Sequence, residues 1–228
     1  MNLKNVTIGL FATTVLFSSC TKDFREVNTD RNVPTEVNAD LLLSGVIRGM
    51  INHQVDEGWG IGNLVAQYHA KIQFVNEDRY LWGERTSVWN AVYGNNRNLQ
   101  NILAQVGASE DNAYHGIALV LKSWMYSIAT NTYGDIPYSE AGQAKTSALY
   151  QPKYDKQEDV YTGILADLKK ANEILARSTN AVSGDILYGG GTGAAIKWRR
   201  LANSLRLRLL LRMSKKKNVN AEMQAILN

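Results

Sequence analysis

The strongest constraint on the fold is a recurring spacing of three and four residues between apolar side chains. Its clearest example is a single stripe, formed by Tyr114, Ile117, Ala118, Leu121, Trp124, Met125 and Ile128. Such spacing places side chains on one face of an α-helix. No stretch alternates with a period of two for long enough to predict a strand. The sequence therefore predicts an all-α fold.

Similar stripes predict helices in most of the chain. The expected segments are 41–50 with Asp40 as N-cap, 61–75 with Leu64, Val65, Tyr68 and Ile72 on one face, 87–106, 160–175 with Asp155 or Gln157 near its start, 196–214, and a last helix from 219. We expect Leu121, Trp124, Leu168, Leu205 and Trp198 in the core. Leucines on several sides of 196–214 predict neighbours on more than one side. Helix pairs of this kind favour a helical-repeat or bundle architecture, although no strict 34-residue period is present.

The only cysteine, Cys20, ends a short apolar segment close to the N-terminus. Lys4 precedes residues 6–17, and the small residues of Phe17-Ser18-Ser19-Cys20 are typical of a lipoprotein signal. The run is too short for a membrane span, which needs about 20 apolar residues. We expect residues 1–19 to be removed, Cys20 to be acylated, 20–38 to form a tether and 39–228 to fold. Plain secretory cleavage and a retained N-terminus are the alternatives.

Charge and cysteine content restrict the possible partners. Residues 20–228 carry 24 basic and 21 acidic side chains, which is close to neutral. Nucleic-acid binding would require a clustered basic face. The densest candidate, 199–217 with Lys215, Lys216 and Lys217 at its end, is expected to be a solvated and salt-bridged surface. With Cys20 acylated no disulfide can form, so the fold depends on its apolar core.

No catalytic, metal or cofactor motif is present in the sequence. His53, His69 and His115 are scattered without metal-ligand spacing. The glycines of 189–193 lack the Lys-Ser/Thr ending of a phosphate loop and predict a flexible loop between helices. The acidic pairs 110–111 and 158–159 are expected at helix starts, where the helix dipole favours them. We therefore expect a protein that is not an enzyme.

Four segments carry a family resemblance. They are Asn131-Thr132-Tyr133-Gly134-Asp135-Ile136-Pro137-Tyr138-Ser139-Glu140-Ala141, Asn38-Ala39-Asp40-Leu41-Leu42-Leu43, Tyr161-Thr162-Gly163-Ile164-Leu165-Ala166-Asp167-Leu168 and Lys197-Trp198-Arg199-Arg200-Leu201-Ala202-Asn203-Ser204-Leu205-Arg206. Together with the lipoprotein signal, they resemble the SusD/RagB family of outer-membrane nutrient-binding lipoproteins, in the starch-binding branch. The resemblance implies an all-α fold of tetratricopeptide-like helix pairs, of which this chain would hold the early ones. The unpartnered helix at the C-terminal end also predicts that the chain is the N-terminal part of a longer protein.

The resemblance also implies a role. SusD-like lipoproteins sit as lids on SusC-like TonB-dependent transporters at the outer membrane and deliver glycans or peptides to them. The segment 133–141 is expected to be structural, with Asp135 capping its own turn. An exported helical-repeat adaptor that binds only protein is the alternative function.

Aromatic side chains are the candidates for sugar contact, because pyranose rings stack on Trp and Tyr. Trp59, Tyr80, Trp82 and Trp89 lie in or beside the glycine-bearing segments 58–62 and 80–94. We expect these four to include the ligand contacts, with ordinary packing as the alternative.

Overall fold

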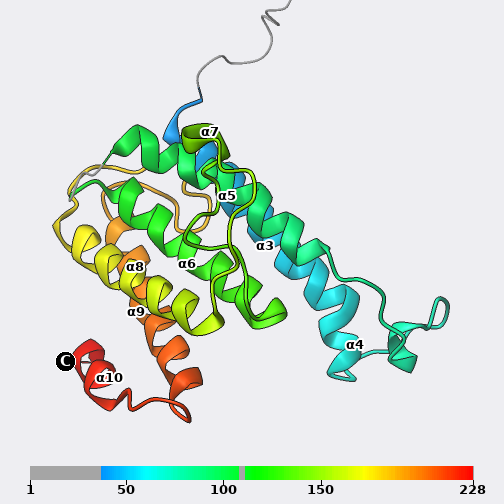
Figure 1. The fold of residues 1–228 in the computed structure, drawn as a ribbon. Helices are drawn as coiled ribbons and strands as arrows, with labels where there is room; N and C mark the ends of the chain where they lie inside the picture. Colours follow the sequence, from blue (N-terminus) through cyan, green and yellow to red (C-terminus); the bar gives the residue numbers. More distant parts are fainter. Residues whose placement is uncertain (1–36, 108–110, 228) are drawn as a thin grey trace, which may run out of the picture. The chain divides into compact units, whose positions relative to one another are not determined.

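The fold is a series of α-helices joined by loops, as the computed structural model in Figure 1 shows. It describes residues 37–107 and 111–227, and these residues contain no strand. The long helices are α3 (Ala39–Glu57), α5 (Ser87–Val106), α6 (Ala113–Tyr133), α8 (Gln157–Arg177) and α9 (Ala194–Met213). The short elements are η1 (Gly58–Gly62), α4 (Asn63–Val65), η2 (Glu77–Arg79), α7 (Ala144–Ser147) and α10 (Asn220–Leu227). The predicted signal peptide and Cys20 lie outside the described residues.

The helices pack on their neighbours in the sequence. Helix α5 packs against α3 and α6, α8 packs against α6 and α9, and α10 packs against α9. Figure 1 shows this side-by-side order across the unit Asn38–Asn228. The all-α prediction is confirmed, and helix pairs of the expected kind are present.

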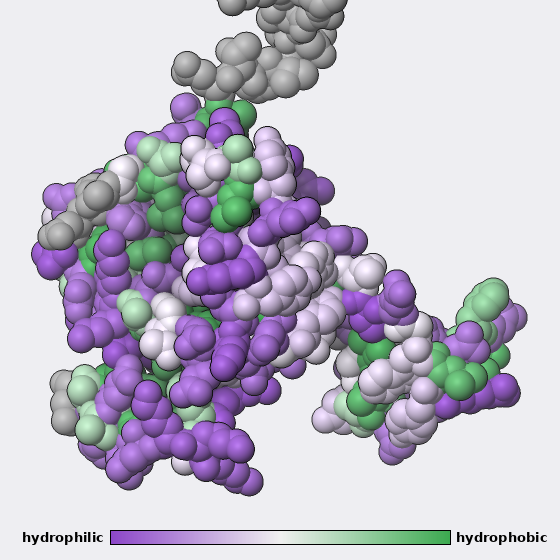
Figure 2. Space-filling model, in the orientation of Figure 1, coloured by the Kyte–Doolittle hydropathy of each residue, from purple (hydrophilic) through white to green (hydrophobic). Residues whose placement is uncertain are grey.

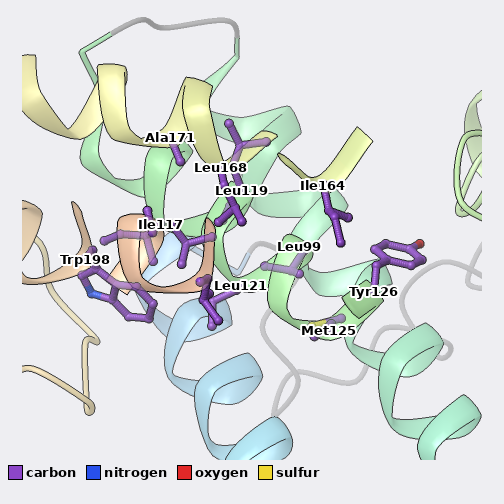
Figure 3. Close-up of a cluster of buried hydrophobic side chains, with 14 of the residues drawn as sticks. Leu99, Ile117, Leu119, Leu121, Met125, Tyr126, Ile164, Leu168, Ala171 and Trp198 are labelled. Carbon is purple, nitrogen blue, oxygen red and sulfur yellow. The ribbon is translucent and has the colours of Figure 1, made fainter. Parts of the chain in front are cut away.

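The core lies between the long helices. Figure 3 shows Leu99 of α5, Ile117 of α6, Leu168 of α8 and Trp198 of α9 in one buried cluster. Helices α6 and α8 approach closely at Gly116, where an added Cβ would lie 2.5 Å from the Leu175 side chain. This contact needs a residue without a side chain, so the glycine allows the two helices to pack at short range.

Most of the core predictions are confirmed. Leu121, Leu168 and Trp198 are at most 2% exposed, and Leu205 is buried as well. Trp124 is different: it is half-buried and packs against the edge of the core. The Trp124 side chain therefore lies at the boundary of the core and is not fully buried in it.

Helix α9 has the several neighbours that its leucines predicted. It contacts α6, α8 and α10, and Leu205, Leu209 and Leu210 are buried among them. Leu211 is 63% exposed, so the buried side of α9 does not extend to every leucine.

The predicted helix over 61–75 is wrong beyond its first residues. The helical conformation ends at Val65, and the chain then turns at Gln67, whose φ is +59°. Tyr68 and Ile72, expected on a buried face, are exposed. The apolar spacing is helical, but no other described helix covers this segment, and helices of this size depend on tertiary packing for stability. Residues 58–86 instead form a projecting segment between α3 and α5, which we call the arm.

The loop 178–193 packs against the first turns of α3. Ser44 Oγ donates a 2.7 Å hydrogen bond to the Gly184 carbonyl, 140 residues away. Gly184 has a φ of +72°, and an added Cβ would lie 2.0 Å from the Asp40 carbonyl oxygen. Asp185 accepts a 2.7 Å hydrogen bond from Trp198 Nε1, which fixes the loop to α9. The segment 189–193 therefore lies in a loop between helices, as predicted, and this loop is bonded to α3 and α9.

Carboxylates fix several helix and loop ends, although not always as predicted. Asp135 does not cap its own turn: its Oδ1 accepts the N–H of Gln157, the first residue of α8, at 2.9 Å. Glu158 and Asp159 lie in the first turn of α8, as predicted. Helix α3 begins one residue before Asp40, whose carboxylate lies in the first turn. For the other acidic pair, Glu110 lies outside the described residues.

Candidate ligand-binding surface

Three of the four candidate aromatic residues lie on the arm. Trp59 is in η1, Tyr80 directly follows η2, and Trp82 comes two residues later. Their exposed fractions are 70%, 65% and 49%. The fourth, Trp89, lies in the first turn of α5 and is half-buried. The structure therefore brings three candidates to one segment and leaves the fourth in another environment.

The arm carries an exposed apolar surface. Figure 2 shows hydrophobic residues gathered on it. The exposed large apolar side chains are Trp59, Val65, Tyr68, Ile72, Phe74, Tyr80, Leu81 and Trp82. Concentrations of this kind are uncommon on a surface that faces only water and mark sites of interaction.

A hollow of about 340 Å³ lies in the arm and has both apolar and polar walls. Its lining comprises Leu64, Gln67, His69, Ala70, Glu77, Asp78 and Tyr80. The Trp59 ring lies 5.0 Å from the His69 ring, and the Tyr80 and Trp82 rings are 6.2 Å apart. This volume is at the lower end of the range for small-molecule sites. We call the hollow the arm pocket.

Two carboxylates give the arm pocket hydrogen-bond acceptors. Glu77 pairs with Lys71 Nζ at 2.6 Å, and the Lys71 hydrogen bond lowers the pKa of Glu77. Asp78 accepts the backbone N–H of Lys71, at 3.3 Å to each oxygen. Ionised carboxylates accept hydrogen bonds from hydroxyl groups and cannot donate them. The pocket wall is therefore suited to a ligand rich in hydroxyl or amine donors.

The backbone of the arm is unusual. Gln67, Phe74 and Tyr80 have φ values of +59°, +54° and +58°, and one other described residue that is not glycine shares this conformation. Such conformations cost energy for residues with a side chain and often occur at functional sites. Tyr80, which lines the pocket, is one of these residues.

The base of the arm is held by Glu57. Its carboxylate accepts hydrogen bonds from Arg85 at 2.8 Å and from Ser87 Oγ at 2.5 Å, which joins the end of α3 to the start of α5. Burial alone would raise the pKa of Glu57, but the bonds from Ser87 and Arg85 outweigh it and the pKa is lowered. The two ends of the arm therefore meet at one ionised side chain.

Trp89 belongs to a separate aromatic cluster. Its ring lies 4.5 Å from Tyr93, 5.5 Å from Tyr133 and 6.1 Å from Tyr154. The Tyr133 hydroxyl accepts the N–H of Trp89 and donates to the Arg85 carbonyl. These contacts fix the segment 133–141 against α5. They support the packing alternative for Trp89, whereas Tyr154, which is 63% exposed, forms the outer edge of the cluster and was not predicted.

The aromatic cluster continues into the core through edge-to-face contacts. Tyr93 contacts Tyr126, and Tyr126 contacts Tyr138. Burial raises the pKa of all three phenols, so they remain protonated. Tyr138 donates a 3.0 Å hydrogen bond to Asp167 of α8 and has the Lys122 ammonium 5.0 Å above its ring. The cluster thus joins the segment 133–141 to α8 and stabilises the fold there.

The polar lining of the arm pocket was not predicted from the sequence. Gln67, His69, Glu77 and Asp78 come together only because the chain turns where a helix was predicted. The apolar spacing of 61–75 contains no signal for a break at Gln67, and the polar run 76–79 lies beyond the predicted helix.

Neither a candidate metal site nor a candidate membrane-spanning helix is present among the described residues. No group of three or more His, Cys, Asp or Glu side chains in 37–107 and 111–227 is arranged to hold a metal ion. None of the helices described is long and apolar enough to cross a membrane.

Comparison with known proteins gives matches over most of the chain. Residues 31–228 match the SusD-like family model described as starch-binding and associating with the outer membrane. A Bacteroides vulgatus outer-membrane protein, described as involved in nutrient binding, shares 30% identity with a TM-score of 0.60 over 82% of this chain and 40% of its own. A SusD homologue from Bacteroides fragilis shares 28% identity with a TM-score of 0.65, and the match covers 85% of this chain and 40% of the homologue. A chitin-binding protein shares 27% identity with a TM-score of 0.62, and the match covers 82% of this chain and 40% of that protein.

No curated protein matches the sequence significantly. The chain spans about 40% of the length of these solved structures.

Proposed function

The chain belongs to the SusD-like family, and on that premise we propose that it binds a nutrient glycan at the outer membrane through the arm pocket and its aromatic residues. The bound glycan is passed to a SusC-like TonB-dependent transporter, and the protein itself catalyses no reaction. The anchor in this proposal is an acylated Cys20, which holds the protein at the cell surface.

The observation that carries the proposal is the combination of exposed aromatic rings and ionised acceptors on the arm. Trp59 and Trp82 offer flat apolar faces, which fit the C–H face of a pyranose. Glu77 and Asp78 offer acceptors to the ring hydroxyls. A sugar presents both kinds of surface at once, so this combination favours a glycan over a wholly apolar ligand.

The relatives support the same class of ligand. One solved neighbour is described as involved in nutrient binding and another as chitin-binding. The transporter partner is inferred from the family alone. Because the chain covers about 40% of the solved relatives, the ligand and the partner are proposals.

The test is calorimetry of the protein with neutral oligosaccharides, including fragments of starch and chitin. Replacing Trp59, Tyr80 or Trp82 by Ala should weaken binding by about 2- to 13-fold, because one aromatic contact is worth about 0.5–1.5 kcal/mol beyond area burial. Tyr150→Ala is the matched control, since Tyr150 is an exposed aromatic outside the arm. If all three arm variants bind like the control, the arm is not the site. Trp89→Ala should lower stability more than affinity.

A second function remains because of one observation, the extent of the apolar surface on the arm. Ile72 and Phe74 are 98% and 87% exposed and offer no hydrogen bonds to a sugar through their side chains. An adaptor that binds only protein would use such residues. In that case no soluble glycan would bind, while Ile72→Ser and Phe74→Ser would abolish the protein contact.

A further inference from the structure

The outer side of α9 carries a strip of basic side chains that the proposed function does not use. Helix α9 contains one lysine, five arginines and no acidic residue. Arg200, Arg208 and Arg212 recur at multiples of four residues, and Lys216 continues the series after the helix ends. All four are exposed. Four residues correspond to a rise of roughly 6 Å along a helix, so the charges follow one another along the surface. We call these four residues the basic strip.

The segment 199–217 was predicted to be solvated and salt-bridged, and the basic strip is solvated but not salt-bridged. Arg206 pairs with Glu222, and Lys197 and Arg199 are bound to Tyr188 and Asn172. In contrast, no member of the basic strip has a side-chain hydrogen bond or ion pair within residues 37–107 and 111–227. Attraction of cations to the end of a helix acts over the last turn only. It accounts for Arg212 but not for Arg200 or Arg208.

The strip leads into a hollow between the end of α9 and the start of α8. The hollow has a volume of about 600 Å³ and is lined by Arg212, Lys216 and Lys217. The rest of the lining comes from Gln157, Glu158 and Tyr161 of α8 and from Met213 of α9. One carboxylate against three cations leaves a positive excess. Figure 2 shows hydrophilic residues over this end of the unit.

We propose that the basic strip and this hollow bind a linear polyanionic polysaccharide through its carboxylate or sulfate groups. Arginine binds such groups with two parallel hydrogen bonds, and a linear chain carries many such groups for the separate cations of the strip and the hollow. The site is distinct from the arm pocket, whose wall is acidic and whose ligand is neutral or hydroxyl-rich.

Two other classes of partner fit the surface less well. A protein interface has an apolar and aromatic centre, whereas the exposed large hydrophobic residues of α9 are only Ile196 and Leu211, at its two ends. A lipid surface would be favoured near the point where the tether joins. Figure 1 places the start of α3 and the last turn of α9 at opposite ends of the unit.

The test measures binding of the whole chain to polygalacturonate and dextran sulfate, with neutral dextran for comparison. The variant R208Q/R212Q/K216Q should bind both polyanions about tenfold or more weakly, and wild-type binding should weaken as salt is raised. The control variant K145Q/K169Q/K170Q removes the same charge from exposed lysines elsewhere and should bind like wild type.

The outcomes separate the possibilities. Equal weakening in the two triple variants would show an effect of net charge and overturn the site. Binding to vesicles of anionic lipid or to an acidic protein, without binding to either polyanion, would overturn the polysaccharide. The arm variants Trp59→Ala and Trp82→Ala should leave polyanion binding unchanged, so failure of the glycan site in the arm would not affect this result.

Discussion

Single carboxylates accept hydrogen bonds at the ends of several helices and loops of this fold. Asp135, Asp155 and Asp185 each accept backbone or indole N–H groups from residues far along the chain. Unpaired donors at helix starts and in tight loops are costly unless an acceptor is supplied. These aspartates supply such an acceptor, and Asp155 also lies 3.7 Å from the Lys153 ammonium.

Replacing Asp135 by Ala should lower the stability of the protein by about 1 kcal/mol, because the N–H of Gln157 at the start of α8 loses its acceptor. Asp135→Asn keeps an acceptor and should cost less. Urea denaturation followed by circular dichroism measures both. Glycan affinity of the folded variants should be unchanged, and a loss of affinity at unchanged stability would contradict the structural role.

The stabilisation by Asp155 should depend on pH. Burial alone would raise the pKa of Asp155, but hydrogen bonds from Ser139 and Tyr138 outweigh this effect and the pKa is lowered. A lowered pKa in the folded state adds stability above the ordinary value of about 3.9 and loses it as the pH falls through the folded value.

We therefore expect Asp155→Asn to be less stable than wild type at pH 7, with a difference that shrinks below about pH 4. Urea unfolding at a series of pH values gives the comparison. A difference that stays constant down to pH 3 would mean that ionisation of Asp155 contributes nothing.

At the scale of elements, the helices with a periodic apolar face were predicted from the sequence, whereas the turns of the arm were not. The stripe of α6 and the bounds of α5 were predicted because these helices have an apolar face that packs on a neighbour. The segment 61–75 has the same spacing but has no neighbour to cover it, so its chain turns at Gln67. Three of the four aromatic site candidates lie on the arm. The acidic lining of the arm pocket could not be predicted, because it depends on the turn at Gln67.

The arm should open independently of the rest of the fold when its base is released. Replacing Glu57 by Ala removes the bonds to Arg85 and Ser87, each worth up to about 1 kcal/mol at this exposure. Together they give up to about 2 kcal/mol, so amide hydrogen exchange in 58–86 should become up to about 30-fold faster, while α6 and α8 exchange as before. Glu173→Ala, at an exposed site on α8, is the control. Faster exchange throughout the protein would show that Glu57 stabilises the whole unit.

At the scale of the whole molecule, the family and the helical architecture followed from the sequence, whereas the ligand did not. Membership rests on residues 31–228, which include all of the described fold. The identity of a ligand depends on side chains brought together by loops, and loop conformation has no simple period in a sequence. The basic strip is a clear example: its arginines were visible, but only the fold shows which of them have partners.

The site of attachment to the membrane can be tested at Cys20, which lies outside the described residues. Replacing Cys20 by Ser should move the protein from the membrane fraction to a soluble fraction, since a multiply acylated cysteine anchors firmly. Cell fractionation with an antibody against the folded part measures this. Ser19→Ala keeps a small residue before the cysteine and should leave partitioning unchanged. Membrane association of Cys20→Ser equal to that of wild type would exclude a lipid anchor at this position.

The contact between the loop 178–193 and α3 has a mechanical consequence if the protein is tethered in this way. A pull on the tether enters the folded unit at Asn38 and acts first on the opening turns of α3. There Ser44 is bonded to the Gly184 carbonyl, and Trp198 of α9 holds the same loop through Asp185. Such a force would be shared with α9 through this loop, so α3 would resist separation from the rest of the unit.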